Sequence, residues 1–253
     1  MIRMFALLCL LIALSPGCVK KDPKVEILRP AYIDAVRPIQ VLNENMTDEL
    51  RGMLRANGWE FTQETFVNIC TASSINRAAH LWITAAHCVT GIGSEGRFIE
   101  KQPVEVIVAK TDTDLAVIGV PAYIAGQELR RQLKPAYWGQ DIIVAGHPFG
   151  YDDLFVTRGY VANPKLLWTP QQYMAFDVAG APGNSGSPVV NLKGELVSVL
   201  QVGWGRSFSP VTGGATSEYL AWFDRYFTPR NTFTTKERSL DTWPDGTFLR
   251  EPF

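Results

Sequence analysis

Between about residue 60 and residue 212 the chain is a series of short apolar runs separated by turn residues, and this pattern restricts the fold most. Alternation of apolar and polar residues is clearest in Val104–Val108, and Asn191–Gly194 is typical of a turn between strands. No helix of the kind that joins parallel strands interrupts the series. Many short strands with regular turns predict an all-β sandwich or barrel. The segments predicted as strands are 80–85, 104–109, 115–119, 141–145, 154–161, 173–178 and 195–202.

Length and charge set broad limits on what the chain does. The 253 residues are enough for one large domain or two small ones, with the 46% hydrophobic and 19% charged content of an ordinary globular protein. The formal net charge is -1. We therefore predict no nucleic-acid or other polyanionic partner.

The N-terminus has the features of an export signal. Arg3 supplies a positive charge, and Met4–Leu14 is an uninterrupted apolar run. This run is too short for a membrane span, which needs roughly 20 residues, but it suits the hydrophobic region of a secretory signal. We predict a signal peptide at 1–17 and a protein exported to the periplasm, the cell envelope or the extracellular space.

The segment Leu14–Cys18 (Leu-Ser-Pro-Gly-Cys) resembles a bacterial lipoprotein signal, in which a small residue precedes a cysteine that becomes lipidated. Lipidation of Cys18 would anchor the protein in a membrane, stably so with several acyl chains. Cleavage without lipidation is the alternative, and the sequence leaves both open. Cys9 would leave with the signal. Cys70 and Cys88 then remain as a candidate disulfide, which an oxidising compartment permits.

The chain divides into four predicted segments: the signal at 1–17, an N-terminal tether, arm and short helix at 18–58, a main domain at 59–228 and a tail at 229–253. The last of these is polar and contains proline. The sequence does not indicate a role for it.

A short helix is predicted near residue 50. Thr47 is a suitable cap, and two acidic residues follow it near the positive end of the helix dipole. Leu50, Met53 and Leu54 share one face of this helix, and Gly58 is a suitable stop.

A second helix is predicted at the end of the main domain. Thr-Ser at 216–217 provides its cap, and Leu220, Phe223 and Phe227 are spaced for burial. Pro229 would end it.

Three segments contain the residue types of nucleophilic catalysis: Trp82–Cys88, Asp112–Val117 and Pro182–Pro188. A serine hydroxyl is a poor nucleophile unless a neighbouring base takes its proton, and an imidazole is suited to that task near neutral pH. A carboxylate on the other ring nitrogen fixes the tautomer and stabilises the imidazolium. The candidates are Ser185, His87 and Asp114.

Each candidate has a competitor in the sequence. His80 precedes a strand and is predicted to be structural or exposed, and His147 lies in a Gly-Pro turn. Asp112 shares a strand face with Asp114, which we prefer because an apolar run begins directly after it. Ser187 lacks the Gly-x-Ser-Gly frame. With three histidines and no close Cys/His/acid cluster, we predict no metal and no cofactor.

Together and in this order, the three segments resemble the trypsin-like serine protease superfamily, whose triad runs His, Asp, Ser. Asp114–Val117, Gly146–Gly150 and Gly183–Gly186 look most like the Deg/HtrA proteases. The resemblance covers about residues 66 to 227. It implies an all-β fold of two six-stranded antiparallel β-barrels, with a short N-terminal helix and a C-terminal helix. Only 68 residues follow the candidate serine, so we expect no PDZ domain after the second barrel.

The same resemblance implies further roles. The amides of Gly183 and Ser185 would form an oxyanion hole, and Cys70 would pair with Cys88, which directly follows the candidate histidine. Digestive relatives become active when a new N-terminus pairs with an aspartate just before the serine. Asn184 takes that position here, so we expect activity without propeptide cleavage at the start of the barrel.

A substrate pocket is also implied by the resemblance. Its base would be Ala179, six residues before the serine, next to Gly180, and the substrate main chain would pair with Gln201, Val202 and Gly203. No acid lies at the pocket base, and no histidine lies on the wall strand. We therefore expect a small or medium apolar side chain at P1, rather than Lys, Arg or Glu.

The sequence thus predicts a serine endopeptidase that hydrolyses polypeptides through an acyl-enzyme. The alternative is a catalytically inactive module of the same fold that binds peptides or proteins. An esterase of the α/β class is excluded by motif order, because that class places its serine before its acid and histidine. The sequence does not give the natural substrate or the oligomeric state.

Overall fold

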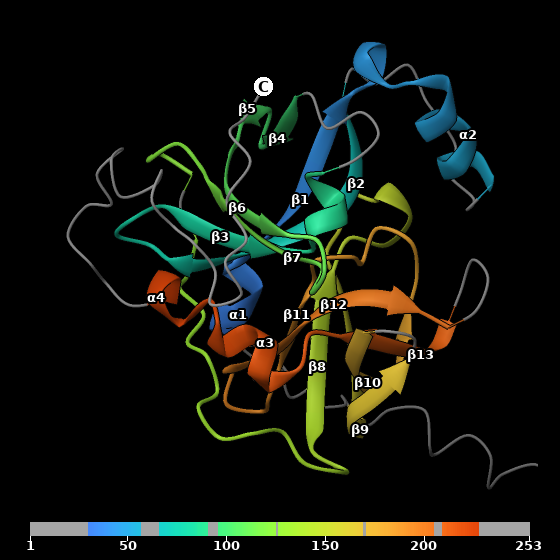
Figure 1. Cartoon of the computed structure of the whole chain (residues 1–253). Helices are drawn as coiled ribbons and strands as arrows, with labels where there is room; N and C mark the ends of the chain where they lie inside the picture. Colours follow the sequence, from blue (N-terminus) through green and yellow to red (C-terminus); the bar gives the residue numbers. More distant parts are fainter. Residues whose placement is uncertain are drawn as a thin grey trace, which may run out of the picture.

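A computed structural model describes residues 30–56, 66–90, 96–124, 126–168, 171–204 and 209–227 (Figure 1). The predicted signal at 1–17, Cys18, Gly58, Pro229 and the tail at 229–253 lie outside these ranges. No helix within the described ranges is long and apolar enough to cross a membrane.

The N-terminal half is a curled seven-stranded sheet with the strand order β5-β4-β1-β2-β3-β7-β6. All neighbouring strands in it are antiparallel. The prediction of a closed six-stranded barrel is therefore wrong for this half. Its strands are β1 (Val36–Leu42), β2 (Phe66–Asn76), β3 (Leu81–Thr84), β4 (Arg97–Ile99), β5 (Gln102–Pro103), β6 (Glu105–Lys110) and β7 (Leu115–Gly119).

The C-terminal half is the closed six-stranded antiparallel barrel that was predicted, with the order β10-β13-β12-β11-β8-β9. It forms the lower part of the molecule in Figure 1. Apolar side chains from its strands fill the interior, among them Ile142, Met174 and Phe176. Its strands are β8 (Asp141–Gly146), β9 (Phe155–Trp168), β10 (Gln171–Gly180), β11 (Pro188–Val190), β12 (Leu196–Gly203) and β13 (Ser209–Gly214).

All seven predicted strand segments overlap a strand of the structure, but other strands were missed. The most important is β1, which lies in the segment expected to be an arm and pairs with β2 from Val36 to Leu42. Pro38 lies within β1 and cannot donate to the sheet, which makes a strand difficult to predict at this place. The N-terminal segment therefore contributes a strand to the middle of the first sheet.

Helices are few and short: α1 (Ala31–Asp34), α2 (Asp48–Ala56), α3 (Ser217–Ala221) and α4 (Asp224–Phe227). In the part of the chain that the structure describes there are also three single 3₁₀ turns: η1 (Asn43–Asn45), η2 (Ala86–Cys88) and η3 (Pro148–Gly150). In α2, Leu50 and Leu54 are buried as predicted, but Met53 is 54% exposed. The helix predicted at the C-terminal end is two pieces, α3 and α4, and Thr216 caps the first by accepting from the amide of Tyr219.

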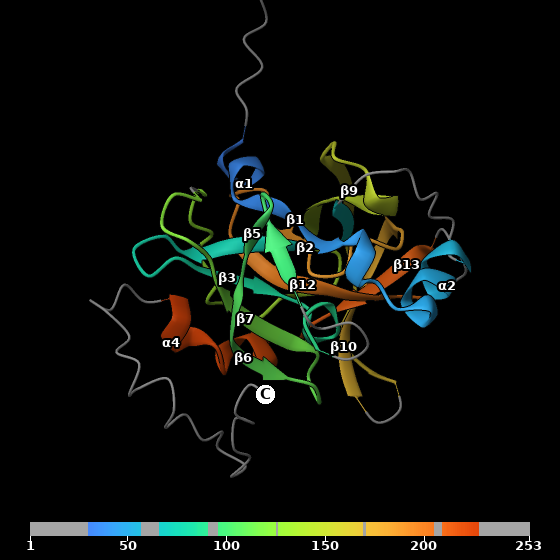
Figure 2. The same cartoon turned by 90° about the horizontal axis from the view of Figure 1, so that it is seen from above.

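A shared apolar core joins the two halves. It combines side chains of the first sheet, such as Ile75 and Ile83, with Val199 of the barrel and with Phe223 and Tyr226 near the C-terminal helices. Helix α4 lies beside the first sheet (Figure 2). The position of one half relative to the other is therefore set by packed side chains.

Candidate active site

His87 and Asp114 form the best-defined pair of the site. His87 lies in η2, directly after β3, and Asp114 lies in the turn between β6 and β7. The imidazole Nδ1 is 2.7 Å from Asp114 Oδ2, and the His87 amide donates to Asp114 Oδ1 at 2.8 Å. The carboxylate thus binds both the ring and the backbone of the same residue. With Nδ1 engaged, Nε2 is the nitrogen left to accept a proton.

Asp114 is held in an unusual backbone conformation. Its φ is 50°, in the left-handed region that non-glycine residues rarely adopt. Three hydrogen bonds reach the backbone at this point: the amide of Ala86 donates to Asp114 O at 3.1 Å, and the buried Gln201 amide group donates to both Thr113 O and Asp114 O at 2.7 Å. Sequence reasoning placed Gln201 against the substrate and missed this role of its side chain, because the contact joins residues 87 positions apart.

The competing residues have other surroundings. Asp112 Oδ2 lies 2.8 Å from Lys110 Nζ, so its carboxylate pairs with a lysine. Asp112 and Asp114 lie in a turn, and the argument from strand alternation does not apply to them. His147 is buried, and its Nδ1 lies 3.2 Å from Tyr151 O. Burial lowers the pKa of His147 below its ordinary value.

Ser185 lies in the loop 181–187 between β10 and β11, which we call the nucleophile loop. Its side chain is partly exposed, whereas Ser187 is fully buried. Gly183 and Gly186 have φ values of 96° and 83°. A Cβ at Gly183 would lie 2.4 Å from His147 O, and one at Gly186 would lie 2.0 Å from a backbone oxygen of β2. These two positions therefore require glycine.

The direction of the Gly183 N–H is set by a hydrogen bond that the carbonyl of the preceding residue accepts. Pro182 O accepts from the amide of Phe149 in η3 at 2.7 Å. In a planar trans peptide the C=O and N–H groups point in opposite directions. The N–H of Gly183 consequently points away from η3, and it donates to no group within the described residues.

The amide of Ser185 is turned in the same way. Asn184 O accepts from the amide of Ser187 at 2.9 Å, so the Ser185 N–H of that peptide points to the other side. It too has no acceptor among the residues that the structure describes. The nucleophile loop thus offers two unused backbone donors, at Gly183 and Ser185, of the kind that stabilise an oxyanion.

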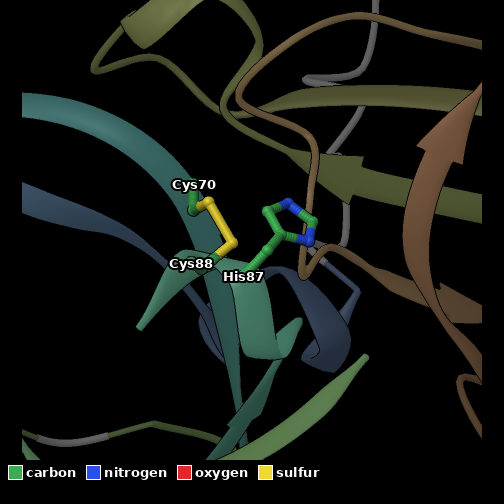
Figure 3. Close-up of side chains that lie close together, drawn as sticks. All are labelled: Cys70, His87 and Cys88. Atoms are coloured by element: carbon green, nitrogen blue, oxygen red, sulfur yellow. A yellow bond between two sulfur atoms is a disulfide. The ribbon is translucent and has the colours of Figure 1, made fainter. Parts of the chain in front are cut away.

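A disulfide joins β2 to η2 beside the imidazole (Figure 3). Cys70 and Cys88 are bonded as predicted, and Cys88 Sγ lies 3.7 Å from Ser185 O, which brings the nucleophile loop next to the histidine segment. The two sulfurs and a ring nitrogen of His87 lie within 4.8 Å of one another. Because the sulfurs are bonded to each other, this cluster offers no thiolate to a metal.

The predicted substrate strand has one free edge. Val202 and Gly203 pair with β13, but β11 pairs with β12 only as far as Val199. On that second side, residues 201–203 have no strand partner in the described part of the chain. Gly180, from the predicted pocket, lies against Thr212, whose Cγ2 would be 2.5 Å from a Cβ at position 180.

Comparison with known proteins gives consistent matches. Residues 70–199 match the family model described as a trypsin-like peptidase domain. A DegP-like periplasmic serine endoprotease of Marinomonas sp. is 38% identical over 93 residues, which cover 34% of this chain and 19% of the relative. A second protein of the same description, from Halomonas elongata, is 32% identical over 133 residues, covering 46% of this chain and 26% of that one. The matched segments are thus about a fifth to a quarter of the length of these relatives.

Solved structures are similar in fold. The Rv3671c protease from M. tuberculosis, in its active form, matches with a TM-score of 0.56 and 19% identity, over 81% of this chain and 86% of that one. The HtrA-type protease AlgW with a decapeptide matches with a TM-score of 0.59 and 16% identity, over 78% of this chain and 65% of AlgW.

Proposed function

The chain belongs to the trypsin-like peptidase domain family, and from this membership we propose that it is a serine endopeptidase with Ser185 as nucleophile, His87 as general base and Asp114 as the orienting acid. The observation that carries the proposal is the double contact of the Asp114 carboxylate with the ring and the amide of His87, at 2.7 and 2.8 Å. This contact fixes the tautomer that leaves Nε2 available to a hydroxyl.

The reaction proceeds in two halves. Ser185 Oγ attacks the carbonyl carbon of the scissile bond while its proton passes to His87 Nε2. Collapse of the tetrahedral intermediate breaks the C–N bond, and the imidazolium gives its proton to the leaving amine. A water molecule then attacks the acyl-enzyme with the same base, which releases the carboxylic acid and restores the hydroxyl. Asp114 holds the imidazole in place throughout.

The negative charge of the intermediate is taken up by the amides of Gly183 and Ser185. In support, neither of these two amides has an acceptor among the described residues. One such donor contributes roughly 3–4 kcal/mol to the barrier reduction in enzymes of this kind.

Polypeptides are the proposed substrates, bound by strand addition to residues 201–203. Ala179, Gly180 and Thr212 are uncharged, which favours a small or medium apolar P1 side chain over Lys, Arg or Glu. A peptide library varied at P1 tests this preference. Cleavage mainly after Lys, Arg or Glu would contradict it.

Activation does not depend on a new N-terminus. Asn184 is 7% exposed and cannot form the ion pair that an aspartate would make there. Recombinant protein with an intact segment 57–65 should already be active. Activity that appears only after cleavage near residue 60 would contradict this.

We propose that the protein works outside the cytoplasm. The named relatives are periplasmic, and the Cys70–Cys88 disulfide fits an oxidising compartment. Lipidation at Cys18 is testable by mass spectrometry of the membrane fraction, where an acylated N-terminal cysteine would be detected. A mature N-terminus without acyl chains would refute anchoring.

A fluorophosphonate probe tests the catalytic proposal directly. The purified protein should form an adduct at Ser185, and His87→Ala should abolish it, while Ser187→Ala should leave it intact. Folding of each variant is checked by circular dichroism. Absence of an adduct on the folded wild-type protein would overturn the proposal in favour of a binding module.

A further inference from the structure

Thr71, a fully buried residue of β2, is bonded to both halves of the molecule. Its hydroxyl donates to Gly183 O at 2.9 Å and accepts from the His147 amide at 3.1 Å, while its own amide donates to Ser185 O at 2.8 Å. Its carbonyl accepts from the hydroxyl of Thr84 at 2.7 Å. Sequence reasoning assigned no role to this residue.

The two loop carbonyls that Thr71 binds belong to the residues with the two unused amides, Gly183 and Ser185. Glycine rotates freely about φ and ψ, so the direction of its amide depends on what holds the peptides on either side of it. Phe149 holds the peptide before Gly183, and the hydroxyl of Thr71 holds the peptide after it. Ser185 O is held instead by the backbone amide of Thr71.

The hydroxyl also ties two loops together. The segment that includes Phe149 is bonded to it through the amide of His147, so one oxygen atom fixes both the nucleophile loop and the turn that supports it. A hydroxyl has one proton to donate and lone pairs to accept, and here both functions are used. Valine has the same shape but provides neither.

We propose that Thr71 is a positioning residue for the oxyanion hole, acting through the backbone of the nucleophile loop. This inference rests on the proposed peptidase function. Thr71 does not touch the substrate. Its hydroxyl holds the peptide after Gly183 and keeps the amide of Gly183 directed to the point where negative charge develops, while its backbone amide holds the carbonyl of Ser185. Loss of the hydroxyl weakens binding of the transition state more than binding of the peptide.

The test compares Thr71→Val, which removes the hydroxyl, with Thr71→Ser, which keeps it. Thr216→Val is the matched control, because Thr216 is also a buried threonine that accepts a backbone hydrogen bond, but it caps α3. kcat and KM are measured on a peptide amide, and thermal unfolding on every variant. Affinity for a peptide boronate, which bonds to the serine and mimics the tetrahedral intermediate, is measured on variants that keep Ser185. Affinity for an uncleaved peptide is measured on the same variants with Ser185→Ala added.

Thr71→Val should lower kcat by about 10- to 100-fold, with less than about a threefold change in KM, since small misplacements of catalytic groups have effects of this size. Boronate affinity should fall by a similar factor, and peptide affinity should not change. Thr71→Ser should remain within about threefold of wild type. Thr216→Val should lower the unfolding temperature and leave kcat unchanged.

Two results would overturn the inference. The first is a Thr71→Val protein that is less stable but keeps kcat and boronate affinity, which would make the hydroxyl purely structural. The second is a Thr71→Ser protein as impaired as Thr71→Val, which would assign the effect to the methyl group. If Thr71→Val does not fold, Thr71→Ala replaces it under the same criteria. A wild-type protein that cleaves no peptide and forms no fluorophosphonate adduct would instead refute the proposed function itself.

Discussion

The two halves of the molecule supply the candidate site in different ways. The open seven-stranded sheet presents candidate catalytic side chains, His87 and Asp114, whereas the closed barrel presents mainly backbone, in the amides of Gly183 and Ser185. Each half has a site residue in the left-handed region of backbone conformation. In the first half this residue is Asp114, with φ of 50°, and in the second it is Gly183, with φ of 96°.

This difference determines how each half can fail. A side-chain pair fails when atoms are removed, because the proton acceptor or its partner is lost. A backbone site fails when atoms are added, because a Cβ pushes the loop away from its supports. Four predictions follow, from the largest expected effect to the smallest, and the first three test this contrast.

Removal of the imidazole should have the largest effect. His87→Ala should lower kcat by about 10⁶-fold, the size found when the base of a serine protease triad is lost. His80→Asn is the control, since His80 is half-buried with φ of 55°, a conformation that asparagine tolerates. Steady-state hydrolysis of a peptide amide measures both. Substantial activity in the alanine variant would show that another group is the base.

Neutralising the carboxylate of Asp114 should have the second-largest effect on kcat. Asp114→Asn keeps the shape of the side chain but presents the wrong partner to the imidazole Nδ1, and we expect a loss in kcat of about 10⁴-fold. Asp112→Asn breaks only the pair with Lys110 and should retain activity within a few-fold. Equal losses in the two variants would contradict the choice between these acids.

Addition of one methyl group at Gly183 should displace the backbone donor that the barrel contributes to the candidate site. Gly183→Ala places a Cβ 2.4 Å from His147 O, and kcat should fall by about 10²- to 10³-fold as the amide donor moves. Gly194→Ala is the matched control, with φ of 78° but only one atom nearby, Tyr32 Cδ1 at 3.7 Å. Both variants share a left-handed strain of about 1–2 kcal/mol. Similar kcat losses in both would show that strain, not collision, is responsible.

The smallest expected effect is on the pH dependence of the free energy of unfolding. Burial lowers the pKa of His147 in the folded protein, so below its ordinary value of 6.5 the unfolded chain binds the proton more readily. The free energy of unfolding should therefore decrease as the pH falls from about 7 to about 5.5, by at most about 1.4 kcal/mol per pH unit from this group. Urea titrations of wild type and His147→Asn measure it. An unchanged slope in the variant would exclude His147 as the source.

Local pattern was enough to predict the motifs, four of the six barrel strands (β8, β9, β10 and β12) and the candidate pair of cysteines. It was not enough for β2, where Asn68, Thr71 and Asn76 are buried although they are polar. Their partners lie far away in sequence, as when Asn76 Nδ2 donates to Tyr226 O. A pattern of apolar residues does not detect a strand whose polar side chains are satisfied by distant groups.

The same limit applies to the site. The residue types of nucleophilic catalysis occur in recognisable segments, so His87, Asp114 and Ser185 could be chosen from the sequence. Thr71 and the side chain of Gln201 could not, because their contacts depend on how the two halves meet. Supporting residues of this kind become visible only in three dimensions.

The apolar core shared by the two halves has a consequence for the behaviour of the whole molecule. Side chains from the first sheet, the barrel and the C-terminal helices are packed in a single cluster, so each half buries this part of its apolar surface against the other. The halves therefore form one cooperative folding unit rather than two hinged lobes. Exchanging one half with a homologue would preserve folding only if the matching side of this cluster were exchanged as well.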